Sequence, residues 1–277
     1  MSSAQDAPFA WIADGRPLTV GLIMALHQIL VRGTSAETVD AGRIRRVPVV
    51  IGSRSAPLQE ACFIPPPPGV DLEASVADIV RWVVDDPTDD GDPVVAAAMA
   101  HYQFETLHPF NDGNGRIGRL LVVVQLMVSG ALTDSLLSIS PWFEARRSEY
   151  RDHLAEVSAT GNWDSWIGFF ADGVAASATD TVQRVDALLE LQRSYHEIVR
   201  QDGGRGIISE VADLLIGLPF VSITQLATPT GRTFPAVNTA VKRLVRLGIL
   251  TEATGNRYGR LFMAPAVMRI YSAPANP

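Results

Sequence analysis

The twelve residues from 108 to 119, HPFNDGNGRIGR, combine residue types that bind phosphate with one that moves a proton. Gly113 and Gly115 allow backbone conformations closed to other residues, so the loop can turn its amides toward one point. The mostly apolar stretch that follows, up to Val128, predicts a buried helix. Its N-terminus would add unpaired N–H groups and a partial positive charge. The segment therefore predicts an anion site at the start of a buried helix.

Charged side chains in this segment suit a polyphosphate and a metal ion. Arg116 and Arg119 are three residues apart, so both should leave the first helical turn on one face and grip phosphate oxygens. Asp112 is a hard oxygen ligand, and Mg²⁺ commonly uses one or two carboxylates and the substrate phosphates. His108, with an ordinary pKa of about 6.5, can accept a proton from a hydroxyl near pH 7. We interpret His108 as a general base and Asp112 as a magnesium ligand.

Each of these residues also has an ordinary structural explanation. A histidine before proline is usually structural, and a single arginine on a helix is usually solvated or paired. Phe110 is expected to point inward and anchor the loop. The combination favours a catalytic phosphate site; an inactive copy is the alternative, although no residue of the pattern is missing.

Helices should carry the loop. Pro93 suits a first helical turn, and that helix should end at His108. Apolar residues at helical spacing, Val20, Ile23, Met24, His27 and Leu30, predict a helix over 18–31. Further helices are expected over 72–84, 115–128, 141–159 and 163–193. Residues 43–51 and 61–64 are predicted to form a β-hairpin around the turn-like GSRSAP, followed by a stiff link at 65–68.

The segment 108–119 matches the motif H-x-F-x-D/E-G-N-G-R-x-x-R of the Fic (filamentation induced by cAMP) family at every specified position. The resemblance extends from about residue 17 to 193 through YQFETLHPF, RRVPVVIGS, CFIPPPP, SPWFEARRSEYRDHL and GNWDSWIGFF. It implies a mostly α fold, a Fic-type helical bundle with a β-hairpin flap. It also implies a protein adenylyltransferase that moves AMP from ATP to a Tyr, Thr or Ser hydroxyl of a target protein.

The same resemblance implies a role for each motif residue. His108 would deprotonate the target hydroxyl, and Asp112 would hold Mg²⁺ on the ATP phosphates. The nucleotide phosphates would be bound by Gly113, Asn114, Gly115, Arg116 and Arg119.

Two further regions carry roles through the resemblance. The hairpin at 45–63 looks like the family's flap, with Val49, Val50 and Ile51 holding the target by main-chain pairing. Tyr150 lies where the family commonly has a Tyr-Tyr pair near the adenine pocket, and Arg151 replaces the second tyrosine. The sequence therefore leaves open an enzyme that uses another phosphate-containing donor.

The inhibitory pattern S/T-x-x-x-E-G/N of many Fic proteins is not found. Ser2 is followed by Asp6 where glutamate is required, and Ser140 to Glu144 is followed by Ala145 in the wrong region. Three explanations stay open: a separate antitoxin chain supplies the helix, the N-terminus has been shortened, or the enzyme is unregulated.

The C-terminal part resembles the winged helix-turn-helix attached to many Fic proteins. Helices are expected at 207–216, over VSITQLA and over FPAVNTAVKRLVRLGIL, then two short strands within TEATGNRYGRLFMA. Residues expected to contact DNA are Asn238, Lys242, Arg243 and Arg246. A protein-binding or homodimer module is the alternative, and a DNA-binding regulator with a secondary Fic domain is the competing class.

Bulk properties set the remaining expectations. The net charge is −7, but the residues from 205 onward carry +5, which leaves −12 on the first 204. Cys62 is the single cysteine, no secretory signal is visible, and the apolar runs are too short for a membrane span. We expect a cytoplasmic protein with an N-terminal extension (1–16), a Fic domain (17–200) and a winged helix domain (205–277).

Overall fold

The structure is a computed structural model that describes residues 17–51, 63–84, 91–256 and 259–274. It separates into two compact units that meet between Ala178 and Thr179, within the long helix α8 (Trp163–Gln201). We call them unit 1, which precedes this point, and unit 2, which follows it. Among the described residues no helix is both long and apolar enough to cross a membrane.

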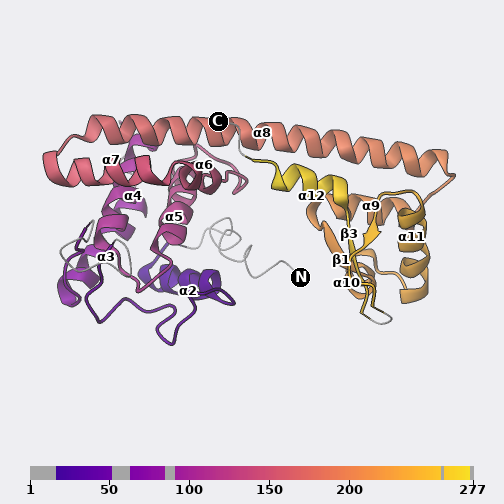
Figure 1. The fold of residues 1–277 in the computed structure, drawn as a ribbon, viewed down its shortest axis with the longest axis horizontal. Coiled ribbons are helices and arrows are strands. Elements are labelled where there is room, and N and C mark those ends of the chain that lie inside the picture. Colours follow the sequence, from indigo (N-terminus) through magenta and orange to yellow (C-terminus); the bar gives the residue numbers. More distant parts are fainter. Residues whose placement is uncertain (1–16, 52–62, 85–90, 257–258, 275–277) are drawn as a thin grey trace. The chain divides into compact units, whose positions relative to one another are not determined.

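Unit 1 is a helical bundle (Figure 1). It contains α2 (Val20–Val31), α3 (Val70–Val84), α4 (Pro93–Leu107), α5 (Asn114–Val128), α6 (Ser140–Ala145), α7 (Arg147–Thr160) and the first part of α8. Helix α5 is central, as predicted, and packs against α2, α3 and α4. Small buried side chains on α4, among them Ala97 and Ala98, let α5 approach closely.

Two apolar clusters lie on different sides of α5. One joins its residues Ile117 and Leu121 to α2, α3 and α4. The other joins Val122 to the aromatic side chains of α6, α7 and α8. Trp166 is fully buried there and donates to the Ala98 carbonyl at 3.0 Å, which confirms that it is a core residue.

The bounds of three predicted elements differ from the structure. The single helix expected over 141–159 is broken at Arg146, where φ is −113° and ψ is 34°. Helix α8 continues to Gln201 instead of ending near residue 193. Of the hairpin, the described residues contain one antiparallel bridge, with Ile51 N to Phe63 O at 2.9 Å and Phe63 N to Ile51 O at 3.2 Å. Residues 52–62, which contain its turn, lie outside the described residues.

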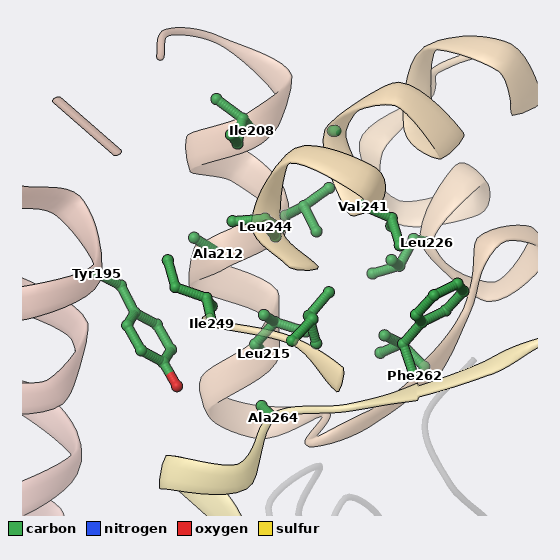
Figure 2. Close-up of a cluster of buried hydrophobic side chains, with 14 of the residues drawn as sticks. Tyr195, Ile208, Ala212, Leu215, Leu226, Val241, Leu244, Ile249, Phe262 and Ala264 are labelled. Carbon is green, nitrogen blue, oxygen red and sulfur yellow. The ribbon is translucent and has the colours of Figure 1, made fainter. Parts of the chain in front are cut away.

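Unit 2 combines helices with a small sheet. After the end of α8 come α9 (Ile207–Gly217), β1 (Phe220–Ser222), α10 (Ile223–Thr230), α11 (Phe234–Arg246), β2 (Thr251–Glu252), β3 (Leu261–Met263) and α12 (Pro265–Ser272). The sheet order is β1-β3-β2, antiparallel throughout, with Val221 opposite Phe262. Leu215, Val241, Leu244 and Phe262 converge in its core (Figure 2).

Strand β1 and helix α12 are elements that the sequence did not predict. The expected helix over VSITQLA begins only at Ile223, because Ser222 forms a capping box with Gln225. This cap leaves the residues before Ser222 extended, and they pair with β3.

Candidate active site

Helix α4 carries His108 to the loop. Asp92 caps its first turn by accepting the Val94 N–H at 2.7 Å. At its end His108 adopts a left-handed conformation, with φ 47° and ψ 59°, while its N–H donates to the Phe104 carbonyl at 3.0 Å. Among the residues that the structure describes, it is the only non-glycine residue with positive φ. Because such a backbone is strained, its neighbours must hold it.

The ring of His108 is set to accept a proton. Nδ1 lies 3.3 Å from the Glu105 carbonyl oxygen, which can only accept, so Nδ1 carries the proton and Nε2 keeps its lone pair. Burial lowers the pKa of His108; the hydrogen bond to Glu105 opposes this effect, and the charge of Arg45 adds to it. The imidazole is therefore neutral near pH 7, as a general base must be.

Phe110 and Asn114 fasten the loop to the core. Phe110 is buried and stacks on His27, with ring centroids 3.9 Å apart and planes 7° apart, which confirms its anchoring role. The Phe110 N–H donates to Asn114 Oδ1 at 2.9 Å, and Asn114 Nδ2 donates back to the Phe110 carbonyl at 2.8 Å. The Asn114 side chain is buried and engaged in this pair, so its predicted phosphate contact is left to its backbone N–H.

His27 supports the loop in a way that the sequence did not reveal. The Gly42 N–H donates to Nδ1 at 2.9 Å, so Nε2 carries the proton and donates to the Asp112 carbonyl at 2.8 Å. Burial lowers the pKa of His27, which favours this neutral form. The sequence signal was only a histidine on the apolar face of a helix, and such residues are usually packing.

Gly113 is required by both conformation and space. Its φ is +80°, and a Cβ at this position would lie 2.9 Å from Val31 Cγ1 and 3.2 Å from His27 Nε2. Helix α5 begins at the next residue, so its first N–H groups have no partner within the helix. The close packing of the loop on α2 thus fixes amides and the positive end of the helix in one place.

The two arginines of the segment turn to different neighbours. Arg116 Nη1 lies 3.3 Å from the Leu30 carbonyl and 3.4 Å from Thr34 Oγ1, at the end of α2. Arg119 contacts α6 instead. Both line the cleft described below, and their contact with phosphate oxygens stays a prediction.

Arg119 is held by two residues of α6. Its Nε donates to Ser140 Oγ at 2.9 Å, and its Nη2 lies 3.1 Å from Glu144 Oε1. Its Nη1 has no hydrogen bond to a described residue and lies beside Gly115. Ser140 and Glu144 were excluded as an inhibitory pattern because Ala145 follows them, and the sequence did not indicate their contact with Arg119.

The residues present fit a magnesium ion that arrives with phosphates. Asp112 lines the cleft, and its Oδ1 accepts the Gly113 N–H at 2.6 Å. In the described part of the chain, no three His, Cys, Asp or Glu side chains are grouped as metal ligands. One carboxylate suits Mg²⁺, which fills its shell with waters and substrate oxygens.

One cleft of about 600 Å³ is lined by His108 and by the loop residues Asp112, Gly113, Asn114, Gly115, Arg116 and Arg119. Val50, Ile51 and Phe63 form one part of its wall, whereas Val49 does not line it. Helix α7 contributes a stripe of residues spaced to share one helix face: Arg147, Tyr150, Arg151, Leu154 and Ser158.

Behind Tyr150 lies a buried polar group that the sequence did not signal. The Tyr150 hydroxyl lies 2.8 Å from His101 Nε2, and Glu105 is one turn further along α4. Burial lowers the pKa of His101 to about 3, raises that of Glu105 to about 7 and raises that of Tyr150. Burial thus favours the uncharged form of all three groups.

The residues predicted to contact DNA lie in unit 2, on α11. Arg243 is bound to the carboxylate and the carbonyl of Asp202, and Asn238 accepts from Arg260 at 3.1 Å. Lys242 and Arg246 are exposed and form no ion pair within the described ranges. Only these two basic side chains of the predicted set are free for a ligand.

Comparisons with known proteins agree with this geometry. Residues 17–126 match the Fic/DOC family. "Protein adenylyltransferase fic-1" of Caenorhabditis briggsae is 37% identical over 113 residues, which cover 41% of this chain and 20% of that protein. "Protein adenylyltransferase Fic" of Drosophila melanogaster is 32% identical over 191 residues, which cover 66% of this chain and 35% of that protein. The matched segments thus span about a fifth to a third of these relatives.

A solved structure shares the fold. A Fic family protein from Desulfovibrio desulfuricans G20 superposes with a TM-score of 0.50 and 21% identity, covering 95% of this chain and 72% of the other. The chain thus has a mostly helical, Fic-like fold with a small three-stranded sheet. Within this fold, residues 17–126 are the part that matches the Fic/DOC family.

Proposed function

We propose that this chain transfers AMP from ATP to a hydroxyl side chain of a protein. The observation that carries the proposal is the state of His108, whose Nδ1 faces the Glu105 carbonyl while the ring lines the same cleft as the glycine loop. A base with a free Nε2 beside an anion site suits attack by a hydroxyl on a phosphate. Relatives named protein adenylyltransferase support the choice of donor and product.

In the proposed reaction, the target hydroxyl, His108 and ATP account for every bond that forms or breaks and for the proton. The target hydroxyl gives its proton to His108 Nε2 while its oxygen bonds to the α-phosphorus of ATP. The bond from that phosphorus to the bridging oxygen breaks, and pyrophosphate leaves. The N–H groups of Asn114 and Gly115 and the charges of Arg116 and Arg119 offset the negative charge that develops. A magnesium ion held by Asp112 would neutralise the phosphates further, and the flap would present the target's main chain.

Mass spectrometry tests this proposal most directly. The purified chain is incubated with ATP and Mg²⁺, alone and with cell lysate, beside His108→Ala. We expect AMP adducts with the wild type and a loss of about 100-fold or more in the variant. His196→Ala, a partly exposed histidine of unit 2, is the matched control and should keep activity. Equal adducts from His108→Ala would overturn the proposal.

A different phosphate-containing donor is the enzymatic alternative. Arg147 and Arg151 line the α7 wall and form no ion pair or hydrogen bond with the residues that the structure describes. A donor that carries extra acceptor groups would suit such a wall. Incubation with GTP, UTP and CDP-choline separates the cases, because an adduct that forms only with one of them keeps the chemistry and changes the donor.

For the C-terminal part we propose a winged helix-turn-helix, extending over 205–277 after a Fic domain at 17–200. The order α9-β1-α10-α11-β2-β3 with a small antiparallel sheet supports this proposal. Lys242 and Arg246 would then contact DNA phosphates from α11. DNA binding should fall with salt, and Lys242→Ala with Arg246→Ala should reduce the salt slope by about two.

A control variant and one outcome bear on this second proposal. Arg200→Ala, on α8, removes an exposed arginine that is paired with Glu197 and should leave DNA binding unchanged. Unchanged binding by the double variant excludes the DNA role and favours a protein-binding module.

We also propose two protein partners: a second copy of this chain, and a separate antitoxin chain that carries an inhibitory helix. Light scattering and mass analysis of co-purified complexes test both.

A further inference from the structure

A buried arginine lies where the flap segment meets the end of α4. Arg45 is 2% exposed, yet its guanidinium forms no ion pair with a carboxylate of the described residues. Its side-chain hydrogen bonds to described residues all go to backbone carbonyls. A buried cation without a counter-ion is costly, so its bonds must be important locally.

Three successive carbonyls at the end of α4 accept from Arg45. Its Nη2 donates to Leu107 at 3.2 Å, its Nε donates to His108 at 2.8 Å, and its backbone N–H donates to Pro109 at 2.8 Å. The last carbonyls of a helix have no partner within the helix and need one elsewhere. Here the partner also holds the left-handed His108, since its bond to the His108 carbonyl resists rotation of that peptide.

The remaining side-chain hydrogen bonds of Arg45 reach the two segments that flank the bridge of the flap. Nη1 donates to the Val47 carbonyl at 3.3 Å, and Nη2 also donates to the Pro66 carbonyl. Val47 precedes and Pro66 follows the Ile51–Phe63 bridge, and Ile51 and Phe63 line the cleft. One side chain therefore connects the two ends of the flap with the residue that carries the proposed base.

We propose that Arg45 is a positioning residue that fixes His108 and the flap relative to each other, so that the target hydroxyl and the base meet in one geometry. The proposal rests on the proposed transfer reaction. A planar guanidinium with five fixed donors suits carbonyls in several directions, whereas the ammonium of lysine is a compact point charge. The positive charge beside His108 also lowers the pKa of His108, in keeping with its proton-accepting role.

The test compares the full-length wild type with Arg45→Lys and with Arg43→Lys, a change at an exposed neighbour. Three quantities are measured: the dissociation constant for ATP with Mg²⁺, the kcat and KM of AMP transfer, and the backbone carbon NMR shifts of His108. We expect Arg45→Lys to keep the ATP dissociation constant within about twofold, because the loop amides are untouched. Its kcat should fall about 100-fold, as a misplaced reacting group commonly costs. The His108 shifts should change, and Arg43→Lys should alter none of the three.

The outcomes separate the two proposals. If the wild type transfers nothing but the His108 shifts change in Arg45→Lys, the transfer reaction fails and the positioning role stands. If transfer and shifts are the same in Arg45→Lys and wild type, the positioning role is overturned. If Arg45→Lys does not fold, hydrogen exchange of the Arg45 Nε–H is measured in the wild type. Slower exchange than at the Arg43 Nε–H supports the hydrogen bond to His108, and equal exchange shows that this bond is absent.

Discussion

The cleft of unit 1 and the surface of α11 in unit 2 both present arginines on helices, but the two regions treat these charges differently. In the cleft, Arg116 contacts neutral oxygens of Leu30 and Thr34, and Arg119 lies 3.1 Å from Glu144, an acid that is 55% exposed. On unit 2, Arg243 is bound to Asp202, and Arg232 is bound to Glu210 at 3.1 Å. The chain therefore cancels with its own acids much of the charge that unit 2 would offer to a ligand.

This difference shows that formal charge is a weak guide to an anion site. The residues from 205 onward carry +5, but their basic groups without an ion pair to a described residue are exposed side chains such as Lys242 and Arg246. The cleft belongs to the part with −12, and the anion site proposed there depends on backbone amides that Gly113 and Asn114 hold in place. Fixed dipoles cost nothing to orient when the ligand arrives.

The largest effect is expected when the fixed loop is disturbed. Gly113→Ala adds a Cβ 2.9 Å from Val31 Cγ1 at a φ of +80°, so the loop must move away from α2. We expect ATP affinity, measured by calorimetry, to fall about 100-fold or more. Gly231→Ala in unit 2 also has positive φ, +60°, but open space around the Cβ. It should reduce stability by about 1 kcal/mol and leave ATP affinity unchanged; equal effects of the two variants would refute the role of close packing.

The next effect is on the pH dependence of stability. Two buried groups at the floor of the cleft, His101 and Glu105, contribute to it with opposite sign. The pKa of His101 is lowered from 6.5 to about 3, so between these pH values the unfolded chain binds a proton that the folded chain lacks, and stability rises with pH. The pKa of Glu105 is raised from 4.5 to about 7, so in that window the folded chain holds the extra proton, and stability falls with pH. The two contributions oppose each other between pH 4.5 and 6.5.

Glu105→Gln removes the contribution of Glu105 to the pH dependence of stability. Stability from urea unfolding should then rise with pH more steeply than in the wild type between pH 4.5 and 6.5, by up to about 1.4 kcal/mol per pH unit. The same slope in both proteins would mean that Glu105 is ionised in the fold.

Sequence reasoning found the loop and most helices because these depend on local rules. Pro93 starts α4, and the apolar run after Arg119 makes α5 the central helix. It missed Arg45 and His27, whose partners lie 63 and 85 residues away, because nothing local distinguishes them from a surface arginine or a packing histidine. It also missed β1, since a strand of three residues exists only through its pairing with β3.

A third prediction compares one arginine from each region. Arg119→Ala should weaken ATP binding about 10- to 100-fold, the usual range for a lost hydrogen bond to a charged group. Arg243→Ala should leave ATP binding unchanged, because that side chain is committed to Asp202, and should lower stability only slightly. Calorimetry and thermal unfolding of both variants measure this contrast, which disappears if Arg243→Ala weakens ATP binding as much as Arg119→Ala.

The smallest effect should come from Glu144, the acid that contacts Arg119 of the cleft loop. Glu144 is 55% exposed and lies 3.1 Å from Arg119, so it draws part of the positive charge away from the phosphates, although solvent screens the pair. Glu144→Gln keeps a side-chain oxygen for Arg119 and removes the charge, and we expect ATP to bind up to about fivefold more tightly. Glu149→Gln, an exposed acid of α7 that does not line the cleft, is the control. Weaker ATP binding in Glu144→Gln would instead mean that the charge of Glu144 orients Arg119 for the ligand. In that case the cleft would resemble the surface of unit 2, because both would need an acid of the chain to hold an arginine.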